Sequence, residues 1–158
     1  MAASIIKPSI ARYRGDDLIQ DTQPEAVSAA WKSSAIVYLS TTGLFTEADG
    51  TTPANITKIY GIAPLAAVGD GSNARVEPLM ADAEMQISVW HSSNVALAVT
   101  AQAMVGTRYA LRKKAAATAP ATTEDTWVLD KANTTDDCVQ VTALCPDSAV
   151  GTQYGTVF

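Results

Sequence analysis

Few residues of this chain belong to the types that carry out chemistry. The single histidine, His91, lies in the run VWHSSN beside Ser92 and Ser93, and neither serine lies in the sharp strand–turn–helix motif that exposes a catalytic nucleophile. One histidine cannot build a multi-histidine zinc site, and Cys138 and Cys145 lack the CxxC spacing of zinc ligands. We therefore interpret His91 as a loop or rim residue, and we predict no catalytic residue and no metal site.

Carboxylates are the other candidates for chemistry, and they occur as adjacent pairs in expected loops. The pairs are Asp16 with Asp17, Glu124 with Asp125, and Asp136 with Asp137. A glycosidase needs two carboxyl groups about 5–9.5 Å apart across a cleft, whereas adjacent loop acids are usually solvated turn residues. The turn at residues 69–72, GDGS, lacks the lysine of a phosphate-binding loop. The sequence thus predicts no cofactor and no enzymatic activity, with a small carboxylate hydrolase as a remaining alternative.

The composition favours a protein with partners but not one that binds nucleic acid. Charged residues make up 17% of the chain, below the roughly 25% of ordinary soluble domains, and hydrophobic residues make up 47%. The low charge indicates that a partner covers much of the surface. A net charge of −5 argues against direct nucleic-acid binding, which needs surplus Lys and Arg at the phosphates. Apolar runs fall short of the roughly 20 residues that span a bilayer, so we predict no membrane partner.

The two cysteines lie at the ends of the run CVQVTALC. If this run is one continuous strand, Cys138 and Cys145 are roughly 23 Å apart, because each residue advances a strand by about 3.3 Å. A disulfide requires Cα atoms within about 7 Å, so the pair could bond only if the chain doubled back. We predict two free, largely buried thiols.

Short stretches of strand-forming residues recur along most of the chain, separated by Gly, Asp, Asn and Pro. The expected strands are 35–40, 56–63, 74–80, 85–90, 95–102, 107–113, 127–130, 138–144 and 153–158. Residues 85–89, MQISV, alternate apolar and polar side chains in the way of a half-buried strand. This spacing predicts a mainly β fold, a small sandwich or barrel with at most one or two short helices.

Residues 1–33 differ from the rest and are expected to form an extended N-terminal arm followed by a short helix. The apolar residues of the first dozen positions follow neither the helix period nor the strand period, and Pro8 and Gly15 interrupt both. A helix is expected at Gln23–Trp31, with Thr22 as its cap and Glu25 completing a capping box. Two interpretations of the leading residues remain: a strap on the chain's own domain, or an arm that reaches a neighbour. We expect two further segments, a first β unit at 34–105 and a second at 106–158 packed on the first.

One stretch resembles a known family. Residues 48–68, ADGTTPANITKIYGIAPLAAV, and the following strand ending in Val89 and Trp90 resemble bacteriophage head-decoration (capsid cement) proteins, in particular the phage lambda head-decoration class. The matching elements are a DGTT turn, a strand end at Gly-Ile-Ala, and small alanines before the next strand. The resemblance covers roughly residues 35–90, and residues 101–158 look like an added C-terminal β unit that compact members lack.

The resemblance implies a β-tulip-like body and a structural function without enzymatic activity. Members of the family bind the outer surface of an expanded capsid and stabilise it, typically as homotrimers whose N-terminal segments dock on the major capsid protein. By this analogy the protein is made in the host cytoplasm and resides on the outer surface of the virion. The expected capsid-binding residues are Ile5, Ile6, Lys7, Pro8, Ile10, Tyr13 and Arg14. The alternatives are another phage module, such as a head fibre, tail or baseplate part, and a carbohydrate-binding adhesin.

Overall fold

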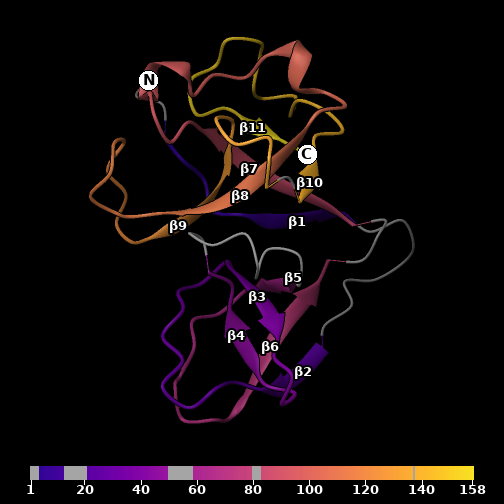
Figure 1. The fold of residues 1–158 in the computed structure, drawn as a ribbon, viewed down its shortest axis with the longest axis vertical. Coiled ribbons are helices and arrows are strands. Elements are labelled where there is room, and N and C mark those ends of the chain that lie inside the picture. Colours follow the sequence, from indigo (N-terminus) through magenta and orange to yellow (C-terminus); the bar gives the residue numbers. More distant parts are fainter. Residues whose placement is uncertain (1–3, 13–20, 50–58, 80–82, 137) are drawn as a thin grey trace. The chain divides into compact units, whose positions relative to one another are not determined.

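The fold is mainly β, with two sheets and two single-turn 3-10 helices among the described residues, which confirms the expected fold class. The computed structural model describes residues 4–12, 21–49, 59–79, 83–136 and 138–158. The chain forms two compact units (Figure 1): unit 1 is Met1–Pro8 with Gln86–Phe158, and unit 2 is Ser9–Met85. The division therefore falls between Met85 and Gln86. The boundary drawn from the sequence near Gly106 lies inside unit 1, in the turn before a long hairpin.

Unit 2 contains a five-stranded antiparallel sheet. In chain order its strands are β2 (Asp21–Pro24), β3 (Ala35–Leu39), β4 (Phe45–Glu47), β5 (Ile59–Ala63) and β6 (Asn73–Pro78), and their spatial order is β2-β6-β5-β3-β4. Ile36, Phe45, Ile62 and Val76 are buried and form much of its core. These β-branched and aromatic residues suit a pleated, buried surface, which explains why the strands form here.

The sheet of unit 2 curls until its two edge strands meet. A parallel bridge joins Glu25, directly after β2, to Phe45 in β4, and the Ala26 N–H donates to the Phe45 carbonyl at 3.0 Å. The Glu25 side chain is buried. Its carboxylate accepts hydrogen bonds from the backbone N–H groups of Val68, Gly69 and Asp70, at 3.2 Å for Val68 and 3.3 Å for Asp70. The Glu25 carboxylate thus links the place where the edge strands meet to the turn between β5 and β6.

The helix expected at Gln23–Trp31 is wrong. Gln23 and Pro24 are instead paired in β2, opposite Ala74 and Asn73 of β6. The local sequence has the features of a capping box, but a capping glutamate would stabilise only one helix end, typically by about 1 kcal/mol. Here Glu25 accepts three backbone hydrogen bonds inside the unit. The tertiary contacts of Glu25 outweigh its local preference.

The second sheet has the order β1-β7-β9-β8-β10, and β11 pairs with β7. Its strands are β1 (Ser9–Arg12), β7 (Glu84–Trp90), β8 (Arg108–Lys114), β9 (Thr126–Asp130), β10 (Val139–Gln140) and β11 (Thr156–Val157). β7 and β9 are parallel, with Val89 opposite Leu129, whereas β8 and β9 form an antiparallel hairpin. Val89, Val128 and Leu129 are fully buried or nearly so, so the parallel pair lies at the centre of the unit 1 core.

The expected strand at 95–102 is wrong, and the one at 138–144 is only partly formed. Residues of the first form two 3-10 helices, η1 (Val95–Leu97) and η2 (Gln102–Met104), and the Asn94 side chain caps η1 by accepting from the Ala96 N–H. Of the second, only Val139–Gln140 pairs as a strand, with an isolated bridge from Leu144 to Val157. The apolar β-branched residues Val95 and Val99 are only partly buried here, so their type does not mark a long strand.

The strand expected at 153–158 forms only at Thr156–Val157, whereas the other remaining strands lie near their predicted positions. Three short strands, β1, β2 and β4, were not predicted. The beginning of the strand expected at 56–63, together with most of the DGTT turn, lies outside the described residues. Both cysteines are free, as predicted; Cys145 is buried and Cys138 half-buried.

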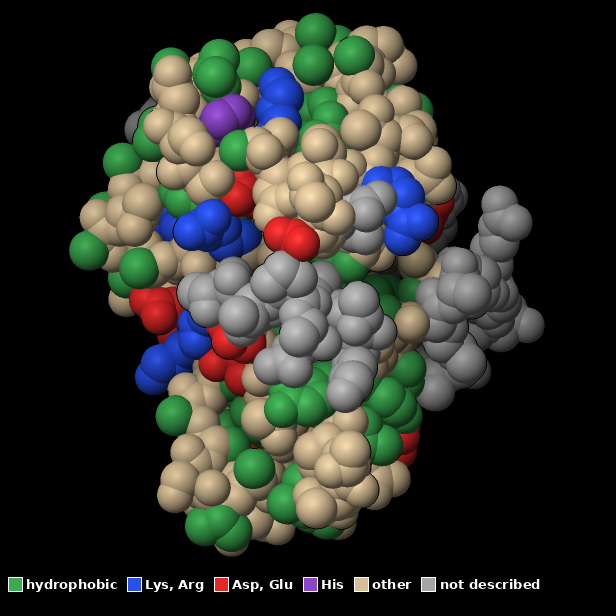
Figure 2. Space-filling model, viewed as in Figure 1, with side chains coloured by type: hydrophobic (Ala, Val, Ile, Leu, Met, Phe, Trp, Pro, Cys, Tyr) green, Lys and Arg blue, Asp and Glu red, His purple; other side chains and the backbone are tan. Residues whose placement is uncertain are grey.

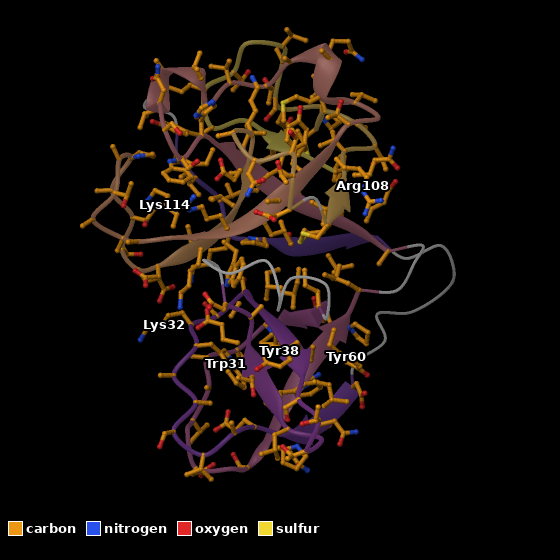
Figure 3. All side chains as sticks on the ribbon, viewed as in Figure 1. Trp31, Lys32, Tyr38, Tyr60, Arg108 and Lys114 are labelled. Atoms are coloured by element: carbon orange, nitrogen blue, oxygen red, sulfur yellow. The ribbon has the colours of Figure 1, made fainter. Side chains whose placement is uncertain are left out.

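A side-chain hydrogen bond ties β2 to β5 across β6. The Tyr60 hydroxyl donates to the Asp21 carboxylate, and Figure 3 shows Tyr60 on the strands of unit 2. This bond, together with a hydrogen bond from the Thr22 N–H, lowers the pKa of Asp21 below its usual 3.8. The same bond raises the pKa of Tyr60 from 10.0 to about 12, because the neighbouring carboxylate favours the protonated phenol.

We expect Glu25→Ala to destabilise unit 2 by about 2 kcal/mol, because hydrogen bonds to a charged group contribute about 1.5–3 kcal/mol and water can replace part of the loss at the partly exposed turn. Glu25→Gln, which keeps one acceptor oxygen, should cost less. Thermal and denaturant unfolding measure both changes. The control is Asp70→Asn, an exposed carboxylate in the same turn, for which we expect about 0.5 kcal/mol or less. Equal effects of Glu25→Ala and Asp70→Asn would contradict the assigned role.

The hydrogen bond between Asp21 and Tyr60 predicts that the stability of the fold changes with pH in two ranges, one alkaline and one acidic. A raised tyrosine pKa stabilises the fold fully below the unfolded value of 10.0, and this contribution is lost as pH rises toward about 12. A lowered aspartate pKa stabilises above the unfolded value of 3.8, and this contribution is lost on further acidification. In Tyr60→Phe the difference from wild type should therefore be largest near neutral pH, about 1 kcal/mol, and should shrink above pH 10. A pH-independent difference in melting temperature would rule out this coupling.

Candidate binding surface

The segment expected to bind a capsid lies, in this structure, as a strap on the chain's own body. Ile5 packs against a buried cluster of unit 1 made of Trp90, Ala98, Val128 and Tyr154. The Ile6 N–H donates to the hydroxyl of the buried Ser88 at 3.0 Å.

Further along the strap, Lys7 is exposed and Pro8 is buried. Ile10 is half-buried within β1. Tyr13 and Arg14, the other two residues predicted to bind, lie outside the described residues. The sequence predicts for the leading residues either a strap on the chain's own domain or an arm that reaches a neighbour. In the structure, residues 4–12 form the strap. We call residues 4–8, the part that belongs to unit 1, the N-terminal strap.

The tip of the β8–β9 hairpin holds this strap. Lys7 forms an ion pair with Glu124, near the end of the tip, and both side chains remain partly exposed. The tip is itself fastened to the core, because the Trp90 indole N–H donates to the Ala119 carbonyl at 3.2 Å. An exposed ion pair contributes at most about 1 kcal/mol, so this ion pair adds little to the attachment of the strap.

Lys114, which closes β8, is buried in the same tip with 1% of its surface exposed (Figure 3). Its ammonium group donates to the Ala115 carbonyl at 3.2 Å and to the Thr122 hydroxyl at 3.4 Å. Burial lowers the pKa of Lys114, and the nearby Asp125 carboxylate opposes that shift. In the sequence Lys114 looks like an ordinary strand-end charge, and no local signal marks it as buried.

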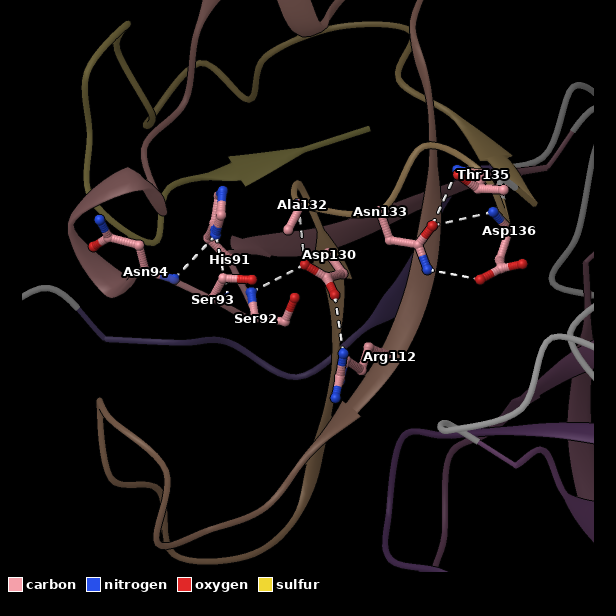
Figure 4. Close-up of polar contacts among 10 residues, drawn as sticks. All are labelled: His91, Ser92, Ser93, Asn94, Arg112, Asp130, Ala132, Asn133, Thr135 and Asp136. Atoms are coloured by element: carbon pink, nitrogen blue, oxygen red, sulfur yellow. Dashed lines mark hydrogen bonds and ion pairs between the residues drawn. The ribbon is translucent and has the colours of Figure 1, made fainter.

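The histidine is used to shape a loop. His91 Nδ1 accepts from the backbone N–H groups of Ser93 at 3.4 Å and Asn94 at 3.2 Å (Figure 4). An Nδ1 that accepts hydrogen bonds carries no proton, so the neutral ring has its proton on Nε2. The Nδ1 lone pair is therefore engaged with the backbone, and it does not face the neighbouring serine hydroxyls.

Asp130 is the buried carboxylate next to that loop, at the end of β9 and opposite Trp90 in the parallel pair. Its Oδ1 accepts from the backbone N–H groups of Ser92 and Ala132, each at 3.1 Å, and its Oδ2 lies 3.4 Å from Arg112 Nη1 (Figure 4). The Arg112 guanidinium also lies 6.0 Å from the centre of the Trp90 ring, the outer limit of a cation–π contact. These contacts hold the loop after β7 to the end of β9.

Apart from Glu124, which pairs with Lys7, the described members of the acidic pairs accept hydrogen bonds within their own loops. Asp125 accepts from the Ala116 N–H at 2.9 Å, and Asp136 accepts from the Asn133 side-chain amide at 2.9 Å. Asp16, Asp17 and Asp137 lie outside the described residues. Within the described part of the chain, no group of three or more His, Cys, Asp or Glu residues is placed to hold a metal ion.

Unit 2 presents an exposed apolar rim formed by two loops that lie side by side. The rim residues are Val27 from the loop after β2, and Leu65 and Val68 from the loop after β5, with Val68 74% exposed. The Trp31 indole donates to the Leu65 carbonyl at 3.2 Å, and the Ser28 N–H donates to the Gly69 carbonyl at 2.8 Å. No local sequence pattern marks these residues, because apolar residues in loops carry no periodic signal.

A scan against protein-family models matched none, and searches of curated proteins and of solved structures found no match for this chain. Among the described residues, no helix is long and apolar enough to cross a membrane.

Because the two rim loops pack closely, we expect alanine substitutions at two glycines with similar backbone angles to lower the free energy of unfolding by different amounts. Gly69 has φ +84°, and a Cβ there would lie 2.8 Å from the Ala29 carbonyl oxygen; Gly43 has φ +78°, and a Cβ there would meet no described atom within 4 Å. We expect Gly43→Ala to cost about 1 kcal/mol for its backbone conformation alone. Gly69→Ala should cost about 1–2 kcal/mol more. Denaturant unfolding measures both, and equal costs would show that the loops separate easily.

Proposed function

We propose that this chain is a virion structural protein that binds the outer surface of an expanded phage capsid and stabilises it. Its partners are the major capsid protein and further copies of itself, most simply in a homotrimer. Docking occurs through the N-terminal segment, with Ile5, Ile6, Lys7, Pro8 and Ile10 as its described contact residues. No enzymatic step, cofactor or metal is part of this function, and the protein resides on the outer surface of the virion.

The observation that carries the proposal is the N-terminal strap, an apolar segment without regular secondary structure. Its described contacts include the packing of Ile5, the hydrogen bond of Ile6 to Ser88, the burial of Pro8 and the exposed ion pair of Lys7. A capsid surface that buries the same apolar side chains can take the place of unit 1, and the exposed ion pair opposes this exchange little. Extended segments also bind by adding a strand to an exposed sheet edge. A strap with these properties is suited to clamp neighbouring capsid subunits.

Two further features support the proposal. The mainly β fold agrees with the class that the resemblance implies. In addition, His91, the histidine considered for catalysis, and the buried Asp130 accept hydrogen bonds from backbone amides and thereby stabilise loops. The chemistry-bearing residues thus have structural uses, in keeping with a structural protein.

The test reverses the charge of each partner of the strap's ion pair in a separate variant and measures cosedimentation of that variant with purified expanded capsids. Lys7→Glu and Glu124→Lys each break the same pair, but only Lys7→Glu alters the segment that docks. We expect Lys7→Glu to weaken capsid binding by about 10-fold, as for a charge at the rim of an interface. Glu124→Lys should bind as well as wild type or better, because it releases the strap.

A deletion of residues 2–8, checked for folding by circular dichroism, provides the second variant. If it binds expanded capsids like the wild type, the docking role of the strap is refuted. If the wild type ignores capsids but binds glycans in an array, the adhesin alternative replaces the proposal.

A further inference from the structure

Two segments of unit 1 are almost free of charge. Residues 92–107 contain no Asp, Glu, Lys, Arg or His, and residues 139–158 contain one, Asp147, although the whole chain has 16 acidic and 11 basic residues. The charged residues of unit 1 gather instead on β8, β9 and their connections, for example Arg112, Glu124 and Lys131. The distribution is therefore uneven within one unit.

Hydrogen bonds join the two segments side by side. At one end, the Tyr154 N–H donates to the Ala98 carbonyl at 2.8 Å, and the Gly151 N–H donates to the Thr100 carbonyl at 2.7 Å. At the other end, the Gly106 N–H donates to the Val141 carbonyl at 2.8 Å. We call the surface of these two segments the uncharged face of unit 1.

This face exposes apolar side chains. Three apolar residues of the face are exposed: Leu97 in η1, Val105 directly after η2, and Val150 directly before Gly151. The exposed fraction of Val150 is 62%. Small residues surround them, including the exposed Ala96 and Ala149. Figure 2 shows mainly hydrophobic and uncharged side chains over the upper part of unit 1, interrupted by the His and by Lys or Arg side chains. Depletion of charge is the compositional mark of the centre of a protein interface.

We propose that the uncharged face of unit 1, centred on Leu97 and Val150, binds a second copy of this chain. The chain carries a net charge of −5, so two identical copies repel one another over most of their surface. Contact through this face brings almost no like charges together. Within the face the only charged residue is Asp147, and charges of both signs border it in the sequence: Arg108, opposite Gln140, and Lys131, whose ammonium group donates to the Val99 carbonyl at 2.8 Å, are basic, whereas Asp136 and Asp137 are acidic. A contact between two copies of the face therefore brings few like charges together.

The proposal is tested by the mass of the protein in solution, from sedimentation velocity and light scattering, without any capsid. We expect the wild type to be an oligomer whose mass does not fall between about 0.05 and about 0.5 M NaCl, because the contact has little electrostatic attraction to screen and salt weakens the repulsion between copies. Val150→Asp and Leu97→Asp should each raise the dissociation constant by at least about 100-fold, since they place like charges against one another in the contact.

The matched control is Val27→Asp, an apolar residue of comparable exposure on the rim of unit 2, which should keep the wild-type mass. Circular dichroism confirms that each variant is folded. A wild type that is a monomer up to about 100 μM, or dissociation by Val27→Asp but not by Val150→Asp, would overturn the proposal. If Val150→Asp keeps its mass but no longer cosediments with capsids, the face binds the capsid instead. An oligomer that ignores capsids would refute the proposed function and leave this inference standing.

Discussion

The buried carboxylate of Glu25 is the interaction on which unit 2 depends. It lies where the curled sheet closes, beside the bridge from Glu25 to Phe45, and accepts the backbone N–H groups of Val68, Gly69 and Asp70. A buried charge is tolerated only when hydrogen bonds replace its lost hydration. Because these donors all come from one turn, the carboxylate also fixes the loops that carry the exposed rim of Val27 and Leu65.

Unit 1 uses Asp130 in a comparable way. The parallel pairing of β7 with β9 brings the ends of both strands together, and Asp130 then holds the loop after β7 through the Ser92 N–H. The ring of His91 shapes the same loop through Ser93 and Asn94. In both units, polar residues that could carry out chemistry instead satisfy backbone amides, which are costly to leave unpaired when buried.

The proposed partners bind two surfaces of unit 1. The N-terminal strap lies on the body through Ile5, Ile6 and an exposed ion pair, and the uncharged face around Leu97 and Val150 exposes apolar groups with few charges among them. The two surfaces have different physical properties. The strap is an extended segment, whereas the uncharged face is formed by two segments that hydrogen bonds join to each other. This difference suits a protein that assembles with itself through one surface and clamps a larger particle with the other.

The sequence by itself determined the mainly β class, most of the long strands and the free cysteines, because alternation and β-branched composition are local properties that burial reinforces. It could not determine the role of Glu25, whose donors lie more than forty residues away, or the burial of Lys114. It also misassigned 95–102, where a cap at Asn94 and contacts with residues 151–154 produce 3-10 turns. Only the tertiary structure decided these points, because they depend on which distant backbone groups meet each side chain.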